Sequence, residues 1–481
     1  MRSRCIRTLF APLAALAVAG CALTRVDPET PELTLPQALP DAQPAAGGDA
    51  VSPTASLPDP WWQMFADPQL DRVIDEGLAR NTDVAVAAAR VAQARAQADI
   101  VGADRLPALD VAAGASRSRQ SVIRQPVQGA RVTSNEYYAS VGVSYELDLW
   151  GRYQHASEAA RARLLASELD RETVLLSLSG DIARAYFALQ AATSQLQRSS
   201  ETLVNREESL RIEKIREEGG ESDEFTLRRV EAEVAAARTS TQQFELEAAR
   251  RANALAVLLG RSPREMLDER VAVADATMTG SVPTLPSGLP SDVLERRPDI
   301  RAAEAELEAS AGDMGVARAE LFPSISLTGV FGWASLELED LFSAPNEEWS
   351  AAGAILQPVF YGGRLRAGVR RADALRQQRR AEYARTVQTA FREVFDGLQG
   401  QNSLQAIETS ATQEERALGR ATELAEFRYK EGDISYLELL DVRRDYYQTQ
   451  INLISSHRDA LTNAVDLALA LGADIGDALG R

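Results

Sequence analysis

Two hydrophobic patterns follow each other along this chain and meet at Gly151. Residues 137–149 alternate between apolar and polar with a period of two, which predicts a long strand with one apolar face and one polar face. Beyond that join, Leu or Ile recurs every seven residues over 175–210, and residues 127–262 contain no proline. The spacing predicts a continuous helix over 152–217, which would be about 100 Å long and would suit close helix packing with a slow supercoil.

The same join occurs a second time at Gly363, where a strand pattern from residue 349 again leads into a proline-free run. Landmarks of the first half recur in the same order in the second half, with an offset between 212 and 216: Asp83 matches Asp299, Pro107 matches Pro323, Gly151 matches Gly363, Gly219 and Ser222 match Gly432 and Ser435, and Gly260 matches Gly472. Such a series predicts an internal duplication. Each half should contain, in order, a helix, a strand, a loop, a strand, a long helix, a turn bearing glycine, and a return helix.

Four strands are expected, and each is long enough to cross a bilayer: residues 107–118, 136–150, 322–336 and 348–361. Their polar faces carry mostly Ser, Gly, Ala and Thr, and four aromatic residues could form an interfacial girdle: Tyr137, Phe331, Trp333 and Trp349. No run of about eighteen apolar residues follows residue 20, so a membrane crossing would require a closed barrel. Four strands cannot close one, whereas two copies would give eight and three would give twelve with room for an aqueous bore. Soluble, half-buried antiparallel hairpins are the alternative.

The N-terminal residues have the features of a secretory signal. Residues 1–20 begin with a basic stretch, continue through an apolar run and end in two small residues before Cys21. The sequence Val-Ala-Gly-Cys resembles a bacterial lipobox, which implies cleavage before Cys21 and acylation of that residue. An ordinary signal with an incidental cysteine is the alternative. Residues 21–60 would then form a proline-rich tether, and with Cys5 removed no free thiol would remain for a disulfide or a metal site.

The formal net charge is −18, which argues against a nucleic-acid-binding surface. The sequence contains neither a G-x-S-x-G elbow nor a Walker loop for phosphate. Its two histidines, His155 and His457, lie inside predicted helices and outside any cluster with metal-ligand spacing. We therefore expect no enzyme, no cofactor and no metal site, and we interpret the chain as a conduit without its own energy source.

Four motifs carry a resemblance to a known family: ELDLWGR at residues 146–152, LPSDVLERRPDIRAAE from Leu289, ARAELFPSISLTG from Ala317 and RYKEGDISYLELLD from Arg428. Together they resemble the outer-membrane efflux lipoproteins of the TolC/OprM type, in the NodT branch of the outer membrane factor family, over residues 61–472. The resemblance implies a homotrimer with a twelve-stranded transmembrane β-barrel and a long periplasmic α-helical barrel. It also implies docking to an inner-membrane transporter through a periplasmic adaptor protein.

The expected fold class is therefore α+β, with an internal duplication and four long antiparallel strands per chain. The signal peptide covers residues 1–20 and the acylated tether residues 21–60. The first repeat covers 61–290, with a β-hairpin at about 107–150 and a helical hairpin at about 152–260. The second repeat covers 291–481, with a β-hairpin at about 322–361 and a helical hairpin at about 364–472.

The resemblance also points to residues at the far periplasmic end of the tunnel. It places an acidic residue facing the axis at Asp441, with Leu437, Glu438 and Tyr429 as further residues of the aperture. Because Glu438 and Asp441 are three apart, they share a helix face, and three copies would stack two rings of carboxylates that repel, raise their pKa values and attract cations. A solvated helix start that favours acidic residues is the alternative. Adaptor docking would use the tips of the helical hairpins: Gly219, Ser222, Gly432 and Ser435.

Two positions depart from the pattern of the family. Ile434 stands where an arginine occurs in a better-known member, and Thr226 stands where an aspartate is common. The contacts that latch the two hairpins should therefore differ in this chain, with Tyr429 as the remaining match.

These features favour a passive outer-membrane exit channel of a tripartite efflux or export system, for the efflux of drugs or other small molecules. The channel would be lipid-anchored in the outer membrane and would extend into the periplasm, and its partners would be the adaptor, the transporter and outer-membrane lipid. An envelope-spanning structural lipoprotein, or the outer-membrane duct of a protein or metal export system, are the alternatives. The sequence does not identify the cargo.

Overall fold

The computed structural model describes residues 24–27, 30–31, 58–119, 133–268, 271, 282–283 and 296–473. Its elements follow one another in this order: η1 (Trp61–Phe65), α2 (Pro68–Arg80), α3 (Thr82–Ala103), β1 (Ala108–Arg119), β2 (Thr133–Leu147), α4 (Arg152–Glu218), α5 (Glu224–Leu258), α6 (Pro263–Asp268), α7 (Pro298–Ala319), β3 (Ser324–Ser335), η4 (Leu338–Asp340), η5 (Ala344–Asn346), β4 (Glu347–Leu356), α8 (Arg364–Glu431) and α9 (Tyr436–Ala470). The order helix, strand, strand, long helix and return helix occurs twice, as the offsets predict.

The chain forms two compact units, and each takes segments from both halves of the sequence. The first unit comprises Met1–Pro31, Arg90–Glu168 and Ala302–Tyr383. The second unit comprises Glu32–Ala89, Leu169–Arg301 and Ala384–Arg481. The strands therefore belong to the first unit, and the turns of the helical hairpins belong to the second.

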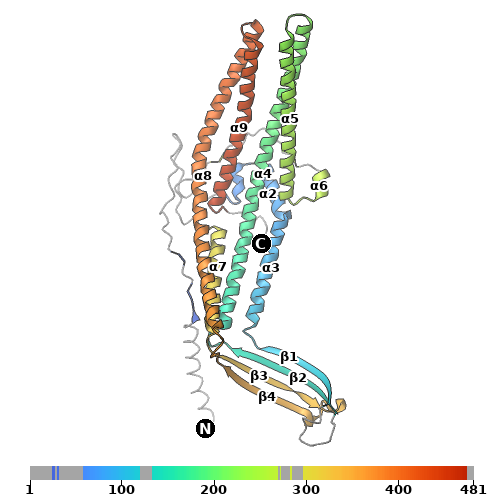
Figure 1. The fold of residues 1–481 in the computed structure, drawn as a ribbon, viewed down its shortest axis with the longest axis vertical. Coiled ribbons are helices and arrows are strands. Elements are labelled where there is room, and N and C mark those ends of the chain that lie inside the picture. The colour runs from blue at the N-terminus through green and yellow to red at the C-terminus, as the bar shows by residue number, and fades with distance from the viewer. Residues whose placement is uncertain are drawn as a thin grey trace. The chain divides into compact units, whose positions relative to one another are not determined.

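The first unit contains a four-stranded antiparallel sheet in the order β1-β2-β3-β4 (Figure 1). Its register aligns one row of apolar residues across all four strands: Val111, Val141, Phe331 and Trp349. The next row, on the opposite face, is small or polar: Ala112, Ser140, Gly332 and Glu348. The period-two pattern therefore separates an apolar face from a polar face. The apolar row is open to solvent in the single chain, where Val111 is 79% and Trp349 75% exposed.

Each pair of strands leads into a long helix through a short connection, residues 148–151 in the first repeat and 357–363 in the second. Between β2 and α4, Gly151 has a left-handed φ of 73°, and Gly363 has a φ of 85° immediately before α8. Asp148 supports the start of α4, because its Oδ2 accepts a hydrogen bond from the N–H of Gln154 at 2.8 Å. Both repeats thus place glycine where the backbone takes an angle that other residues rarely adopt.

Two strands end earlier than the sequence pattern predicts. The strand expected over 136–150 covers Thr133–Leu147, because the chain turns at Leu149, whose N–H donates to the carbonyl oxygen of Leu147 at 3.0 Å. The strand expected over 348–361 ends at Leu356, since Pro358 has no N–H to donate to a sheet. The short helices η4, η5 and α6 were not predicted.

The second unit is built mainly from two helical hairpins, α4 with α5 and α8 with α9 (Figure 1). Three heptad positions of α4 are buried in it, namely Leu175, Ile182 and Leu189. The short helices η1 and α2 attach to α4 through polar contacts. Trp61 donates from Nε1 to the hydroxyl of Ser179 at 3.1 Å, and Asp67, which caps α2, accepts from the hydroxyl of Tyr186 at 2.7 Å. These contacts attach η1 and α2 to the stretch of α4 that carries the buried heptad positions.

In the described ranges, no helix combines the length and the apolarity needed to cross a bilayer. Some expectations concern residues outside these ranges. They are the signal peptide, Cys21, most of the tether over 21–60, the β1–β2 connection at 120–132 and most of the link between the repeats.

Candidate functional site

Most of the candidate residues lie in, or within two helical turns of, the connections from α4 to α5 and from α8 to α9. Gly220 has a φ of 75° in the first turn, and Gly432 has a φ of 80° in the second. In each turn the N–H of the following residue donates back to the last turn of the long helix at 2.8 Å. This is the Schellman arrangement, in which a left-handed glycine lets the chain satisfy the final carbonyls of a helix. The two long helices therefore end in the same way.

These turns correct the alignment of the repeats by one residue. The sequence comparison paired Gly219 with Gly432 and Ser222 with Ser435, but the backbone angles pair Gly220 with Gly432. The helix caps agree with the structural pairing, because Asp223 caps α5 and Ser435 caps α9. The sequence offers two consecutive glycines in the first turn, and only the backbone conformation distinguishes them.

Ser435 and Glu438 form a capping box at the start of α9. The N–H of Glu438 donates to the hydroxyl of Ser435 at 3.3 Å, and the N–H of Ser435 donates to Oε2 of Glu438 at 2.8 Å. The hydroxyl of Ser435 also donates to Oε2 of Glu438 at 3.0 Å, and the two hydrogen bonds that the carboxylate accepts, from the N–H and the hydroxyl of Ser435, lower the pKa of Glu438 below its ordinary value of 4.5. A lowered folded-state pKa means that the contribution of the box to stability is present above pH 4.5 and is lost as the pH falls through the folded value. In the single chain, the pKa of Glu438 is therefore lowered, whereas a ring of three carboxylates in a trimer was expected to raise it.

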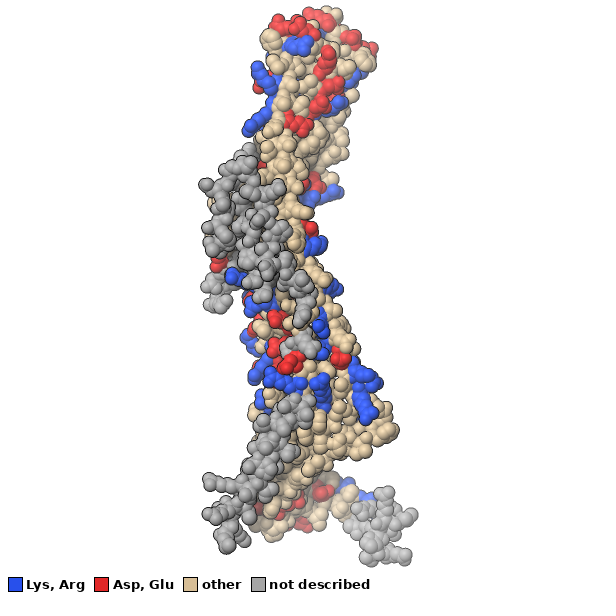
Figure 2. All heavy atoms as spheres, turned by 90° about the vertical axis from the view of Figure 1, so that its left-hand side faces the viewer, with Lys and Arg blue, Asp and Glu red and all other residues tan. Residues whose placement is uncertain are grey.

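Leu437 and Asp441 lie on the exposed side of the same helix start. Leu437 is 43% exposed, and Asp441 is paired with Arg444 at 3.5 Å, one turn further along α9. On the face seen in Figure 2, acidic and basic side chains gather over the turns of the helical hairpins. Glu438 and Asp441 are both exposed in the single chain, so both carboxylates are accessible to a neighbouring molecule.

Tyr429 connects the two helical hairpins. Its hydroxyl accepts a hydrogen bond from Nη1 of Arg216 at 2.8 Å, and the guanidinium carbon lies 5.7 Å from the centre of the tyrosine ring. The ring also meets Tyr436 edge to face, with 5.6 Å between centroids. Arg216 belongs to α4 and was missed by the sequence analysis. Its only signal is its place in the last turn of a helix, where basic residues are common because of the helix dipole.

Glu213 is a second residue that the sequence analysis missed. It lies in α4, is only 4% exposed, and accepts a hydrogen bond from the hydroxyl of Ser222 in the following turn. A buried carboxylate requires such a donor, because burial without one is costly. The side chain of Ser222 is therefore engaged by the helix that precedes its turn, while Gly219, Gly432 and Ser435 are exposed.

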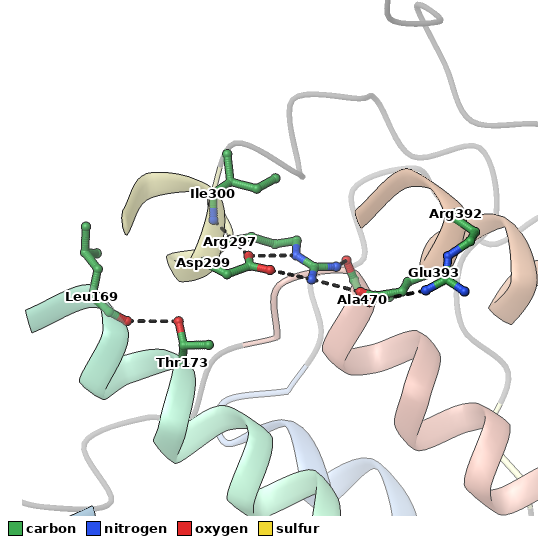
Figure 3. A network of polar contacts seen from close by, with 8 residues as sticks. All are labelled: Leu169, Thr173, Arg297, Asp299, Ile300, Arg392, Glu393 and Ala470. Carbon is green, nitrogen blue, oxygen red and sulfur yellow. Dashed lines mark hydrogen bonds and ion pairs between the residues drawn. The ribbon is translucent and has the colours of Figure 1, made fainter. Parts of the chain in front are cut away.

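Another polar network joins α7, α8 and α9 in the second unit (Figure 3). Arg297 lies directly before α7 and is 8% exposed. It donates to the carbonyl oxygen of Ala470 at 3.1 Å, to Oε2 of Glu393 at 2.9 Å and to both carboxylate oxygens of Asp299. The two carboxylates offset the cost of burying the guanidinium group. Arg297 belongs to the motif from Leu289, but its role was not predicted.

The two histidines each contact one carboxylate. Nδ1 of His155 lies 3.2 Å from Glu158, and Nδ1 of His457 lies 2.6 Å from Glu408. Among the residues that the structure describes, no three His, Cys, Asp or Glu side chains are placed to hold a metal ion. Near the turns, the hydrogen bond between Arg216 and Tyr429 joins the two helical hairpins, and the contact of Tyr429 with Tyr436 joins α8 to α9.

The fold defines a class of protein in which two strand hairpins continue into two long helical hairpins, and comparisons with known proteins identify that class. The sequence model of the outer membrane efflux protein family matches residues 73–261 and 289–473. The chain is 34% identical over 460 residues to the solvent efflux pump outer membrane protein SrpC of Pseudomonas putida. The alignment covers 95% of this chain and 96% of that protein. It is 33% identical over 460 residues to the cation efflux system protein CusC of Escherichia coli, with the same coverage.

A solved structure gives the same result for the fold. The crystal structure of the open state of the Neisseria gonorrhoeae MtrE outer membrane channel matches with a TM-score of 0.82 and 31% sequence identity, over 94% of this chain and 98% of that chain. The chain therefore belongs to the outer membrane efflux protein family. It is the outer-membrane channel of an efflux system, and the predicted family, fold class, function and location are confirmed.

Proposed function

We propose that three copies of this chain assemble into a passive exit duct. The observation that carries this proposal is the sheet: in the described part of the chain, β1 pairs only with β2 and β4 only with β3. Open edges of long strands are not tolerated in a bilayer, because their N–H and C=O groups find no water there. Three copies would join β4 of each chain to β1 of the next and close twelve strands.

The two faces of the sheet support an open bore. The exposed apolar row of Val111, Val141, Phe331 and Trp349 would face lipid. The opposite face, with its small and polar side chains, would line the lumen. Eight strands from two copies would leave a filled interior, whereas twelve leave room for water and cargo.

The turns of the helical hairpins would form the periplasmic end of the duct. Leu437, Glu438 and Asp441 are exposed at the start of α9, where three-fold symmetry would bring their copies together as a narrow aperture. Tyr429 and Arg216 would latch the two hairpins in the closed state, because their hydrogen bond connects α4 to α8. The exposed tips at Gly219, Gly432 and Ser435, together with Ser222, would meet the adaptor.

The partners would supply both energy and selection. Relatives at similar identity are named for different cargo, since SrpC belongs to a solvent efflux pump and CusC to a cation efflux system. The channel sequence therefore does not select one cargo class, and we assign selection to the inner-membrane transporter that it reaches through a periplasmic adaptor. The channel itself would need neither catalysis nor a cofactor.

The ends and repeats would then have distinct roles. Residues 1–20 would direct export and be removed, Cys21 would carry the acyl anchor, and residues 21–60 would tether it to the body. The repeats over 61–290 and 291–481 would each contribute one strand hairpin and one helical hairpin to the protomer.

Conductance in a planar lipid bilayer tests the duct. A stable ion current after verified trimer insertion supports a continuous bore. No current from inserted trimers would favour an envelope-spanning structural lipoprotein, which needs the same anchor and helices but no lumen. Susceptibility profiling of a deletion strain, with the gene restored as the control, would then identify the cargo.

A further inference from the structure

Thr24, three residues after Cys21, is completely buried in the first unit. Its hydroxyl donates to the carbonyl oxygen of Trp150 at 2.8 Å, and the same oxygen lies 3.1 Å from Nε2 of His155. Because a hydroxyl carries a single hydrogen, His155 is the donor in the second contact. The short segment that follows the predicted acylation site is therefore held by specific hydrogen bonds at the join between β2 and α4.

The imidazole of His155 is itself fixed in place. Its side chain is 8% exposed, and Glu158 lies 3.2 Å from its Nδ1. Gly315 of α7 packs against the ring so closely that an added Cβ would come within 2.7 Å of two ring atoms. Only a glycine at this position leaves space for the histidine. α4 thus supplies His155, the partner of Thr24, and α7 leaves the space that its ring occupies.

A second contact holds the same segment a few residues later. Nη1 of Arg376 in α8 donates to the carbonyl oxygen of Asp27 at 3.4 Å. Trp150, whose carbonyl binds Thr24, is also held in position. Its indole stacks on Phe322 with 4.8 Å between centroids and donates a hydrogen bond to the carbonyl oxygen of Pro323 at 2.6 Å. Thr24 therefore binds to a rigid point where the strands end and the helices begin.

We propose that Thr24, Trp150 and His155 form a clasp that holds the acylated end of the chain beside the ends of the strands. The inference rests on the proposed acylation of Cys21. Three residues of extended chain span at most about 11 Å, so an acyl group on Cys21 would enter the membrane close to Trp150. Aromatic residues at strand ends lie at the membrane interface of outer-membrane barrels. The clasp would thus hold the lipid anchor at the same depth in the membrane as the ends of the strands.

Tryptic cleavage after Arg25 reports the state of the clasp. Arg25 is exposed, and the sequence has no other Lys or Arg between Cys21 and Asp71, so cleavage releases one peptide that carries the anchor. Trypsin can cleave after Arg25 only when the segment around Thr24 detaches from the rest of the first unit. The cleavage rate therefore follows the population of the detached state. The assay uses full-length mature protein in detergent, with trypsin added briefly under native conditions and intact mass as the readout.

Thr24→Val removes the hydroxyl at nearly constant shape, and Thr24→Ser is the matched control that keeps it. We expect Thr24→Val and His155→Ala to raise the cleavage rate about five-fold, the effect of losing one net hydrogen bond, and Thr24→Ser to stay within about two-fold of wild type. Cleavage of Thr24→Val at the wild-type rate, or of Thr24→Ser as fast as Thr24→Val, would overturn the clasp. The mass of the released peptide separately tests acylation: an unmodified Cys21 would refute the anchor, whereas the cleavage rates still judge the clasp.

Discussion

Arg297 holds the last turn of α9, because its Nη1 donates to the carbonyl oxygen of Ala470 at 3.1 Å. The first repeat makes the same contact with a different side chain, since Nδ2 of Asn81 donates to the carbonyl oxygen of Leu258 at 2.8 Å at the end of α5. In both repeats, the residue immediately before a helix (α3 or α7) caps the C-terminal end of the return helix. The duplication therefore preserves a point of attachment although the chemistry of the donor has changed.

Arg297→Met should lower the free energy of unfolding by about 2 kcal/mol, because it removes the guanidinium group that donates to the carbonyl of Ala470 and to the carboxylates of Asp299 and Glu393. The neighbouring Arg296 is exposed, so Arg296→Met is the matched control and should have little effect. Thermal unfolding followed by circular dichroism, at one scan rate for all variants, measures the difference. Equal melting of Arg297→Met and Arg296→Met would show that the network contributes nothing.

The contact between Arg216 and Tyr429 should hold the aperture closed. Arg216→Ala and Tyr429→Phe each remove the hydrogen bond, which contributes about 1 kcal/mol, and should raise the open fraction about five-fold in single-channel recordings. The double variant should gain no more than either single variant, because both remove one interaction. Tyr446→Phe is the control, since it removes a hydroxyl that contacts Glu415 within one hairpin. Additive effects, or an equal effect of Tyr446→Phe, would contradict the latch.

Asp441→Asn should weaken block of the current by a multivalent cation about ten-fold, because it removes three carboxylates from the aperture of a trimer. We use Asp441 alone because Glu438 also caps α9, and its replacement would disturb the helix start. Asp445→Asn, four residues further along the same helix and also exposed, is the matched control. If both variants are blocked as strongly as wild type, the narrowest point lies elsewhere in the tunnel.

Cys21→Ser should abolish labelling with palmitate but leave trimer formation intact. One acylated residue contributes membrane affinity, whereas closure of the barrel depends on hydrogen bonds along the strand edges. Labelling that persists in the variant would contradict the lipobox. Loss of the trimer together with the label would show that anchoring and assembly are coupled.

The large elements could be predicted from the sequence because they depend on local patterns. The change of period at Gly151 marks the join of strand and helix, and the repeated offset marks the duplication. The ends of the strands were predicted less accurately. The apolar pattern continues after Leu356, but Pro358 has no N–H with which to extend the hydrogen bonds of the sheet. The turn pairing was wrong by one residue because Gly219 and Gly220 are adjacent.

The polar contacts could not be predicted in the same way. Arg216 and Tyr429 are 213 residues apart and meet through the packing of two hairpins, which no periodicity encodes. Thr24 and Glu213 are buried, but polar residues are mostly exposed, and nothing in the neighbouring sequence distinguishes these two from exposed ones. Such groups become recognisable only when their partners are known.

The central claim is that the open edges of β1 and β4 are completed by neighbouring chains. Mass measurement of the mature protein, extracted and kept in mild detergent, tests it directly. We predict a complex of three chains that persists on dilution, because the edge hydrogen bonds are satisfied only in the closed assembly. A monomer or a dimer under these conditions would contradict the twelve-stranded duct.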